Sequence, residues 1–263
     1  MKKYALIFTA ALFSAGFVSA QTTKPGIEQE AKKTPATASS SATTGSAKPV
    51  AINANSTPLE LAQAALQAHG GDKFKTMKSL TEIGTAEVSL PGSAQALTVG
   101  YKLIIAGEKY RFEINSPFAN FQQIYDGENM YASAGGSDIP PLSKLGINLI
   151  AKAGEPGYAV SALPDKKKQR GFRIATPEGY ATDFYLNQAT GQVAGYEAKF
   201  IARGKEVTTA VEHDKFRTVE GILVPEKFSQ RFDIGGNTFY ANFKAKEILV
   251  NTTIADDVFA APQ

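Results

Sequence analysis

The 263-residue sequence contains no cysteine and no tryptophan, and it has only two histidines, His69 and His213. Without cysteine the chain can form no disulfide, no thiolate metal site and no cysteine-linked lipid anchor. The two histidines lack the H-E-x-x-H or H-x-H spacing of metal sites, so we predict no bound metal. A G-x-S-x-G nucleophile elbow, a P-loop and a dinucleotide-binding glycine fingerprint are also absent. We therefore expect no cofactor and, as the leading interpretation, no enzymatic activity.

The sequence also has no large excess of either charge, with 28 Lys and Arg against 25 Asp and Glu and a net charge of +3. Two lysines, Lys2 and Lys3, precede the first apolar run, and without them the net charge is +1. Residues 21–56 hold four lysines and two glutamates, a further +2, which leaves −1 for the rest. A nucleic-acid partner is therefore not expected, because such partners require a basic surface.

The N-terminus has the three regions of a secretory signal peptide in residues 1–20. Lys2 and Lys3 precede an apolar run at residues 4–17, and Val18-Ser19-Ala20 forms a small-x-small cleavage site. The apolar run is shorter than the roughly 20 residues of a transmembrane helix. We predict cleavage after Ala20 and export to the periplasm, with no membrane-spanning segment.

Residues 21–56 consist largely of Ala, Thr, Ser, Lys and Pro, with no aromatic residue. Such a segment cannot bury enough apolar surface to offset its conformational entropy. We predict a disordered tether, followed by one domain over residues 57–263.

Two helices are predicted in this domain. Thr57-Pro58-Leu59-Glu60 has the pattern of a capping box, and Gly70-Gly71 ends the helix that follows. His69 would then lie at the helix C-terminus, where a positive charge is favourable. Residues 141–153 have apolar positions at helical spacing and end before Gly154, so we predict a single helix there and regard it as a candidate lid.

Most of the remaining chain alternates between apolar and polar residues. Phe228, Gln230 and Phe232 fall on one face of a predicted strand, and Phe239 and Phe243 continue the pattern after the glycines at 235–236. This period of two is typical of half-buried antiparallel strands. Counting such runs predicts an α+β fold, mainly antiparallel β, with about ten or eleven strands, a number at which sheets curl or close.

A long curved sheet covered by few short helices has more apolar surface than those helices can cover. With sixteen Phe and ten Tyr in the chain, we expect a half-barrel that encloses an apolar cavity. His213 is in phase with Val207, Thr209 and Val211, so we expect a buried, hydrogen-bonded histidine.

Five short stretches identify a family resemblance: His69-Gly-Gly-Asp-Lys73, Met77-Lys-Ser-Leu80, Asp126-Gly-Glu-Asn-Met-Tyr131, Asp214 to Pro225 with Val-Glu-Gly221 at its centre, and Asp256-Asp-Val-Phe259-Ala-Ala-Pro262. In their order along the chain they resemble the LolA/LolB-like outer-membrane lipoprotein-sorting proteins, particularly their uncharacterised exported relatives. The resemblance covers about residues 57–262. Unlike the membrane-bound members, this chain lacks an anchoring cysteine and has a long tether.

The resemblance implies an incomplete (half) β-barrel wrapped over two or three short helices, with a hydrophobic cavity for lipid or for the acyl chains of lipoproteins. The helix at residues 142–153 would be its lid. The cavity residues implied are Leu97, Val99, Tyr101, Leu103, Tyr110, Phe112, Ile114, Leu142, Leu145, Leu149, Phe228, Phe232, Phe239 and Phe243.

The leading hypothesis is a periplasmic carrier that holds a lipid or the acyl chains of a lipoprotein. The alternative is a non-catalytic envelope interaction or structural module with a fully packed core and an envelope protein partner. A third hypothesis is a hydrolase that uses an unrecognised acid or His213.

Overall fold

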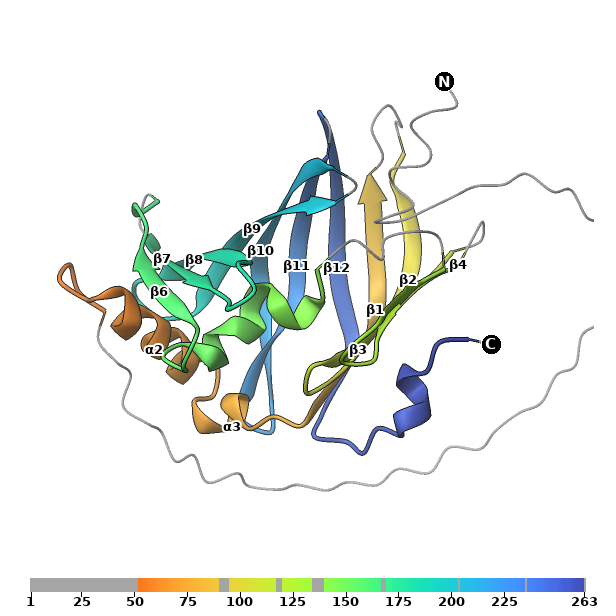
Figure 1. The fold of residues 1–263 in the computed structure, drawn as a ribbon, viewed down its shortest axis with the longest axis horizontal. Helices are drawn as coiled ribbons and strands as arrows, with labels where there is room; N and C mark the ends of the chain where they lie inside the picture. Colours follow the sequence, from red (N-terminus) through yellow and green to blue (C-terminus); the bar gives the residue numbers. More distant parts are fainter. Residues whose placement is uncertain are drawn as a thin grey trace, which may run out of the picture.

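The computed structural model describes residues 52–89, 95–116, 120–133, 140–166, 169–202, 204–234 and 236–262. The predicted signal peptide and residues 21–51 of the predicted tether lie outside the described residues. Over these ranges the chain forms one curved antiparallel sheet with short helices against it (Figure 1).

The sheet has twelve strands within the described residues. Their bounds are β1 Ser79–Ser89, β2 Leu97–Ala106, β3 Lys109–Asn115, β4 Asn120–Tyr125, β5 Met130–Ala132, β6 Ala159–Ala162, β7 Gln169–Ala175, β8 Ala181–Asn187, β9 Val193–Ala202, β10 Lys205–Val219, β11 Ile222–Ile234 and β12 Asn237–Val250. Their order across the sheet is β5-β4-β3-β2-β1-β12-β11-β10-β9-β8-β7-β6. The sheet is open, with β5 and β6 at its two edges, and is not closed into a barrel.

This strand order explains how the chain covers its own sheet. The first five strands run from the centre to one edge, and β6 begins at the opposite edge. The connection from β5 to β6 must therefore cross the sheet, and its helical part lies within the curve of the sheet in Figure 1. The remaining strands return to the centre, where β12 pairs with β1.

The predicted fold class, an incomplete antiparallel barrel with few short helices, is confirmed. The predicted count of about ten or eleven strands is slightly low, because β6 and β7 lack the apolar alternation by which strands are counted in the sequence. β6 is Ala-Val-Ser-Ala, without a large apolar residue, and β7 has only Phe172 and Ile174 as alternating large apolar positions. Patterns this short do not stand out from a loop.

Within the described residues, two α-helices precede the sheet, α2 (Pro58–Ala68) and α3 (Asp72–Lys75). The predicted capping box is present: the Glu60 N–H donates to Thr57 Oγ1 at 3.3 Å, and the Thr57 N–H donates to the Glu60 carboxylate at 2.7 Å. Leu61, Ala62 and Ala65 of α2 are buried in the larger core cluster, together with residues of β7, β8 and β11. The helix is thereby fixed against one half of the sheet.

The predicted single helix at 141–153 is wrong. The segment forms two 3₁₀ helices, η1 (Leu142–Lys144) and η2 (Gly146–Lys152), separated by Leu145 in an extended conformation (φ −138°, ψ 157°). Leu145 is buried against Phe200 and Val207, and the Gly146 N–H donates to Thr182 Oγ1 at 3.2 Å. These contacts with the sheet outweigh the helical periodicity of the sequence.

Gly146 permits this break because its φ is +73°. A Cβ at this position would lie 2.9 Å from Cζ and Oη of Tyr196. We expect Gly146→Ala to lower the free energy of unfolding by about 2–3 kcal/mol, from backbone strain and from the clash. The measurement is urea-induced unfolding.

Gly204→Ala is the matched control, because Gly204 has a similar φ of +68° and an added Cβ there would meet nothing within 4 Å. Its free energy of unfolding should fall by only about 1 kcal/mol, which is the cost of holding alanine in a left-handed backbone conformation. Equal losses in the two variants would contradict a role for the Tyr196 contact.

The outer face of the sheet is covered in part by the C-terminal segment η3 (Asp256–Phe259). Phe259 is buried with Ile104 of β2 and Ile124 of β4. Arg111 of β3 donates from Nη1 to the carbonyl of Val258 at 2.9 Å. The outer face of β2, β3 and β4 is therefore packed against the C-terminal segment.

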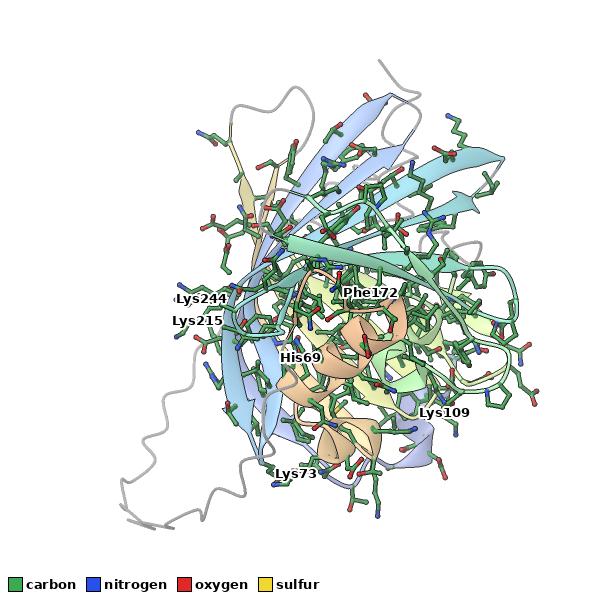
Figure 2. All side chains as sticks on the ribbon, turned by 90° about the vertical axis from the view of Figure 1, so that its left-hand side faces the viewer. His69, Lys73, Lys109, Phe172, Lys215 and Lys244 are labelled. Carbon is green, nitrogen blue, oxygen red and sulfur yellow. The ribbon has the colours of Figure 1, made fainter. Side chains whose placement is uncertain are left out.

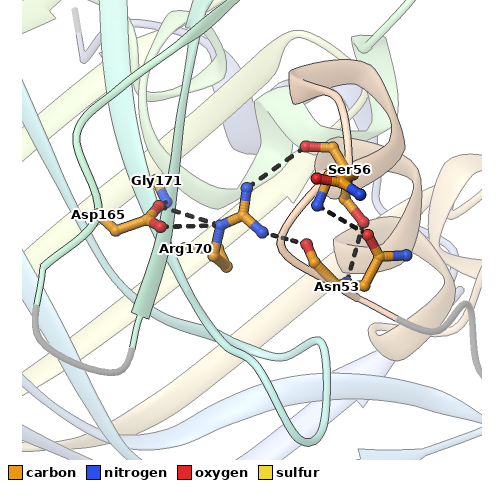
Figure 3. Close-up of polar contacts among 6 residues, drawn as sticks. Asn53, Ser56, Asp165, Arg170 and Gly171 are labelled. Carbon is orange, nitrogen blue, oxygen red and sulfur yellow. Dashed lines mark hydrogen bonds and ion pairs between the residues drawn. The ribbon is translucent and has the colours of Figure 1, made fainter.

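Arg170 of β7 attaches the segment that precedes α2 to the sheet (Figure 3). Its guanidinium donates to the backbone carbonyls of Asn53 and Ser56, and its Nε donates to Asp165 at 3.1 Å. Asp165 also accepts from the Gly171 N–H at 3.0 Å. The folded part of the chain thus includes residues just before Thr57.

Candidate ligand-binding cavity

A cavity of about 220 Å³ lies between the inner face of the sheet and residues 140–158 of the connection from β5 to β6, which we call the crossing segment. One wall comes from β1 to β4, the facing wall from β9 to β12, and η1 and η2 contribute Leu142, Ile147 and Asn148. Most lining side chains are apolar, and many are aromatic. The lining residues are Phe74, Met77, Leu80, Glu82, Tyr101, Leu103, Ile105, Phe112, Phe121, Gln123, Pro140, Leu142, Leu145, Ile147, Asn148, Tyr196, Phe200, Thr209, Val211, His213, Val224, Pro225, Phe228, Gln230, Phe232 and Phe243.

More than half of the predicted cavity residues line this cavity, namely Tyr101, Leu103, Phe112, Leu142, Leu145, Phe228, Phe232 and Phe243. The others do not. Val99, Ile114 and Phe239 are buried in a core cluster beside the cavity, and Leu97 packs against that cluster. Tyr110 is buried with its hydroxyl 3.4 Å from the Met130 sulfur, and Leu149 belongs to the core around α2. The inner face thus packs against itself beyond the cavity.

Aromatic pairs form part of the cavity wall. Phe228 stacks on Phe243 with ring centroids 4.7 Å apart and an interplanar angle of 12°. Tyr101 meets Phe243 edge-on at 5.2 Å. These pairs come from β2, β11 and β12, so the same alternation that predicted the strands places their rings together. This part of the wall is consequently apolar and closely packed.

Some lining residues escaped the sequence prediction although a signal existed. Phe121 of β4 and Phe200 of β9 occupy alternate positions of their strands, a period of two that can be found in the sequence. Phe74 and Met77 come from α3 and the turn after it, and no periodicity identifies them.

Glu82 is the main polar feature of the cavity that the sequence pattern did not predict. Its side chain lines the cavity although the residue is only 4% exposed. Its cross-strand neighbours are Leu103 on β2 and Ile248 on β12. The carboxyl makes no hydrogen bond or ion pair within the described residues, and burial raises its pKa to about 8. Glu82 is in phase with Leu80, Ala86 and Val88, so an acidic residue shares one face of β1 with apolar residues. This exception to the alternation is visible in the sequence.

The Tyr101 hydroxyl is buried and has no hydrogen-bond partner in the described part of the chain. Burial, and then the nearby Glu82 carboxyl, raise the pKa of Tyr101 well above its usual value. Buried polar groups without partners are uncommon in folded proteins. Two of them at one cavity therefore call for an explanation.

His213 also lines the cavity, and its Nδ1 lies 2.8 Å from the carbonyl of Val193. The expected hydrogen-bonded histidine is confirmed, although the residue is half-buried and not fully buried. Burial lowers its pKa to about 4, so that the ring is neutral at pH 7.

His69 is buried at the end of α2 and faces the sheet, whereas Lys215 and Lys244 lie on the outer side of the sheet (Figure 2). The Nε2 atom of His69 accepts from the Val193 N–H at 3.1 Å, and its Nδ1–H donates to the carbonyl of Leu223 at 3.0 Å. Burial lowers its pKa to about 4. The expectation of a positive charge at this helix end is therefore wrong, because burial outweighs the helix dipole.

Two other features bear on function. No group of three or more His, Asp or Glu side chains in the described ranges could hold a metal ion. Among the same residues, no helix has the length and hydropathy needed to cross a membrane.

No family model and no curated protein matches the sequence. Among solved structures, a LolA superfamily protein from Nitrosomonas europaea is similar with a TM-score of 0.51 and 12% identity, over 76% of this chain and 97% of that one. The chain has the LolA-superfamily fold. A putative outer membrane lipoprotein-sorting protein domain from Vibrio parahaemolyticus (TM-score 0.46, 12% identity, 76% and 95% covered) and a DUF1329 family protein from Desulfovibrio piger (0.45, 9%, 77% and 95%) are also similar.

The resemblance found in the sequence is thus confirmed at the level of the fold. The LolA-like region comprises most of the described chain, and its cavity lies between the curved sheet and the crossing segment.

Proposed function

We propose that this protein is a non-enzymatic periplasmic carrier that holds an apolar chain of a lipid or of an acylated lipoprotein in its LolA-like cavity. The observation that supports this most directly is a space of about 220 Å³ lined mainly by apolar side chains on the inner face of an open sheet. A fully packed core, which the alternative of an interaction module requires, would leave no such space.

The cavity volume favours one chain over a bulky multi-chain lipid, because pockets for drug-sized ligands are roughly 300–1,000 Å³. Each methylene group removed from water contributes about 0.8 kcal/mol. Binding would then be reversible and governed mainly by chain length.

The crossing segment is the proposed cover. Leu142, Leu145 and Ile147 contribute to the lining, and the 3₁₀ geometry of η1 and η2 has weaker hydrogen bonding than an α-helix. A displacement of this segment would open the cavity without breaking a strand pair.

A substitution that reduces the volume of the cavity tests this proposal. Leu103 of β2 lines it, and Leu103→Trp places an indole in the space that a chain would occupy. If about two methylene groups are excluded, affinity for a fluorescent fatty alcohol should fall about tenfold. Direct fluorescence titration of ligand-free protein measures this.

Lys102→Trp is the matched control, because Lys102 precedes Leu103 on the same strand and faces the other side of the sheet. It should leave affinity unchanged. Equal binding by the two variants, or no binding by the unmodified protein, would contradict the carrier proposal and favour the interaction module.

A further inference from the structure

Glu82 is the one carboxyl group that the described structure places in the lining of the cavity. It is more than nine-tenths buried and aimed into the apolar space, with Leu103 and Ile248 beside it on the neighbouring strands. The Tyr101 hydroxyl, buried and equally without a hydrogen-bond partner in the described chain, belongs to the same lining.

The other titratable groups of the lining are Tyr101, Tyr196 and His213. Both phenols are close enough to the Glu82 carboxyl to interact with it electrostatically. His213 is neutral near pH 7, because burial lowers its pKa to about 4. The lining contains no lysine or arginine among the described residues, so the cavity offers no positive charge to the head group of a ligand.

An anionic head group would therefore be buried here without a countercharge, which is strongly unfavourable. A cationic group would find a carboxyl group and several aromatic rings in the lining, including those of Tyr101, Phe228 and Phe243. Aromatic rings attract ammonium groups, most strongly where water is excluded.

We propose that the cavity selects amphiphiles that carry an ammonium group, and that Glu82 pairs with this group while the apolar walls bind the chain. This inference rests on the proposed function, since it names the ligand class of the same cavity. A glutamine at position 82 could form hydrogen bonds with a ligand but would stay neutral. A carboxyl group can also ionise, and it can therefore supply the negative charge that an ammonium group requires.

The pairing predicts proton release. In the ligand-free cavity Glu82 is largely protonated at pH 7, because burial raises its pKa to about 8. An ammonium ligand stabilises the carboxylate, so binding should release close to one proton, and affinity should increase between pH 6 and pH 8. A ligand held only by hydrogen bonds would release none.

The experiment uses three probes with the same chain: dodecylamine, dodecanol and dodecanoate, each below its micelle concentration. Isothermal titration calorimetry in two buffers of different ionisation enthalpy gives affinity and proton release together. Ligand-free protein should bind dodecylamine about tenfold or more tightly than dodecanol, and dodecanoate most weakly.

Glu82→Gln should abolish the preference for the amine and the proton release, while dodecanol binding remains. Glu87→Gln is the matched control, since Glu87 is exposed on the outer face of the same strand, and it should behave as the unmodified protein. Equal affinities for amine and alcohol, or a preference that survives Glu82→Gln, would overturn the inference and leave the carrier proposal intact. Failure of all three probes to bind would overturn both.

Discussion

Glu82→Gln is expected to raise the free energy of unfolding of the ligand-free protein by about 3 kcal/mol at pH 7. Most substitutions at buried positions destabilise a protein. Here the carboxyl has no hydrogen-bond partner in the described chain, and burial raises its pKa from 4.5 to about 8. Removing the ionisable group removes the cost of keeping it protonated.

The direction of this stability change follows from the pKa of Glu82, which is 4.5 in the unfolded chain and about 8 in the folded protein. Below pH 4.5 the Glu82 carboxyl is protonated in both the folded and the unfolded protein, so the variant and the unmodified protein should be equally stable. As pH rises toward 8, the unfolded chain releases the proton and the folded chain retains it, which destabilises the unmodified protein. The difference should grow by about 1.4 kcal/mol per pH unit in this range.

Urea-induced unfolding at pH 4.5, 6, 7 and 8 measures this difference. Glu87→Gln, on the exposed face of the same strand, should stay within about 0.5 kcal/mol of the unmodified protein throughout. A Glu82→Gln protein that is less stable at pH 7, or a difference independent of pH, would mean that Glu82 has a structural partner.

His69→Ala is expected to lower the free energy of unfolding by about 4 kcal/mol. His69 joins three elements: it ends α2, donates to the Leu223 carbonyl of β11 and accepts from the Val193 N–H of β9. Its ring also packs edge-on against Phe216 at 5.2 Å. The substitution removes the partner of the buried Val193 N–H and of the part-buried Leu223 carbonyl, and it removes this packing. Urea-induced unfolding at pH 7 measures the loss.

The same residue makes stability sensitive to acid. Its pKa is about 4 in the folded protein and 6.5 in the unfolded chain, so between pH 6.5 and 4 only the unfolded state gains the proton. The unmodified protein should lose about 3 kcal/mol over this range through His69, and His69→Ala should lack that loss. Gln63→Ala, exposed on the same helix, is the control. A His69→Ala protein that retains the full acid sensitivity would contradict the buried, neutral histidine.

The sequence was sufficient to predict the sheet because its strands are long and one-sided. Phe239 and Phe243 are buried while Tyr240 and Lys244 are exposed, as the alternation requires. The capping box of α2 was equally predictable, since it depends only on neighbouring residues. Local patterns thus predict those elements whose environment is set by their own periodicity.

The conformation of residues 142–152 and the composition of the cavity lining depend instead on contacts between segments that are distant in the sequence. Residues 142–152 have helical periodicity, yet Thr182 and Tyr196, more than thirty residues away in the chain, fix the backbone at Gly146. Burial on the inner face was predictable for Ile114 and Phe239, but whether such a residue lines a cavity or packs against another side chain depends on the curvature of the whole sheet. Glu82 escaped prediction because apolar periodicity identifies the apolar members of a row and not an acid that shares their face.

Native mass spectrometry of the protein purified from the cells that make it would show whether the cavity holds an apolar chain. We expect a fraction of the protein to carry an additional mass that organic extraction removes, and the extract to contain a molecule with an apolar chain. A single ligand-free mass, in a protein that also fails to take up dodecanol or dodecylamine, would contradict the carrier function.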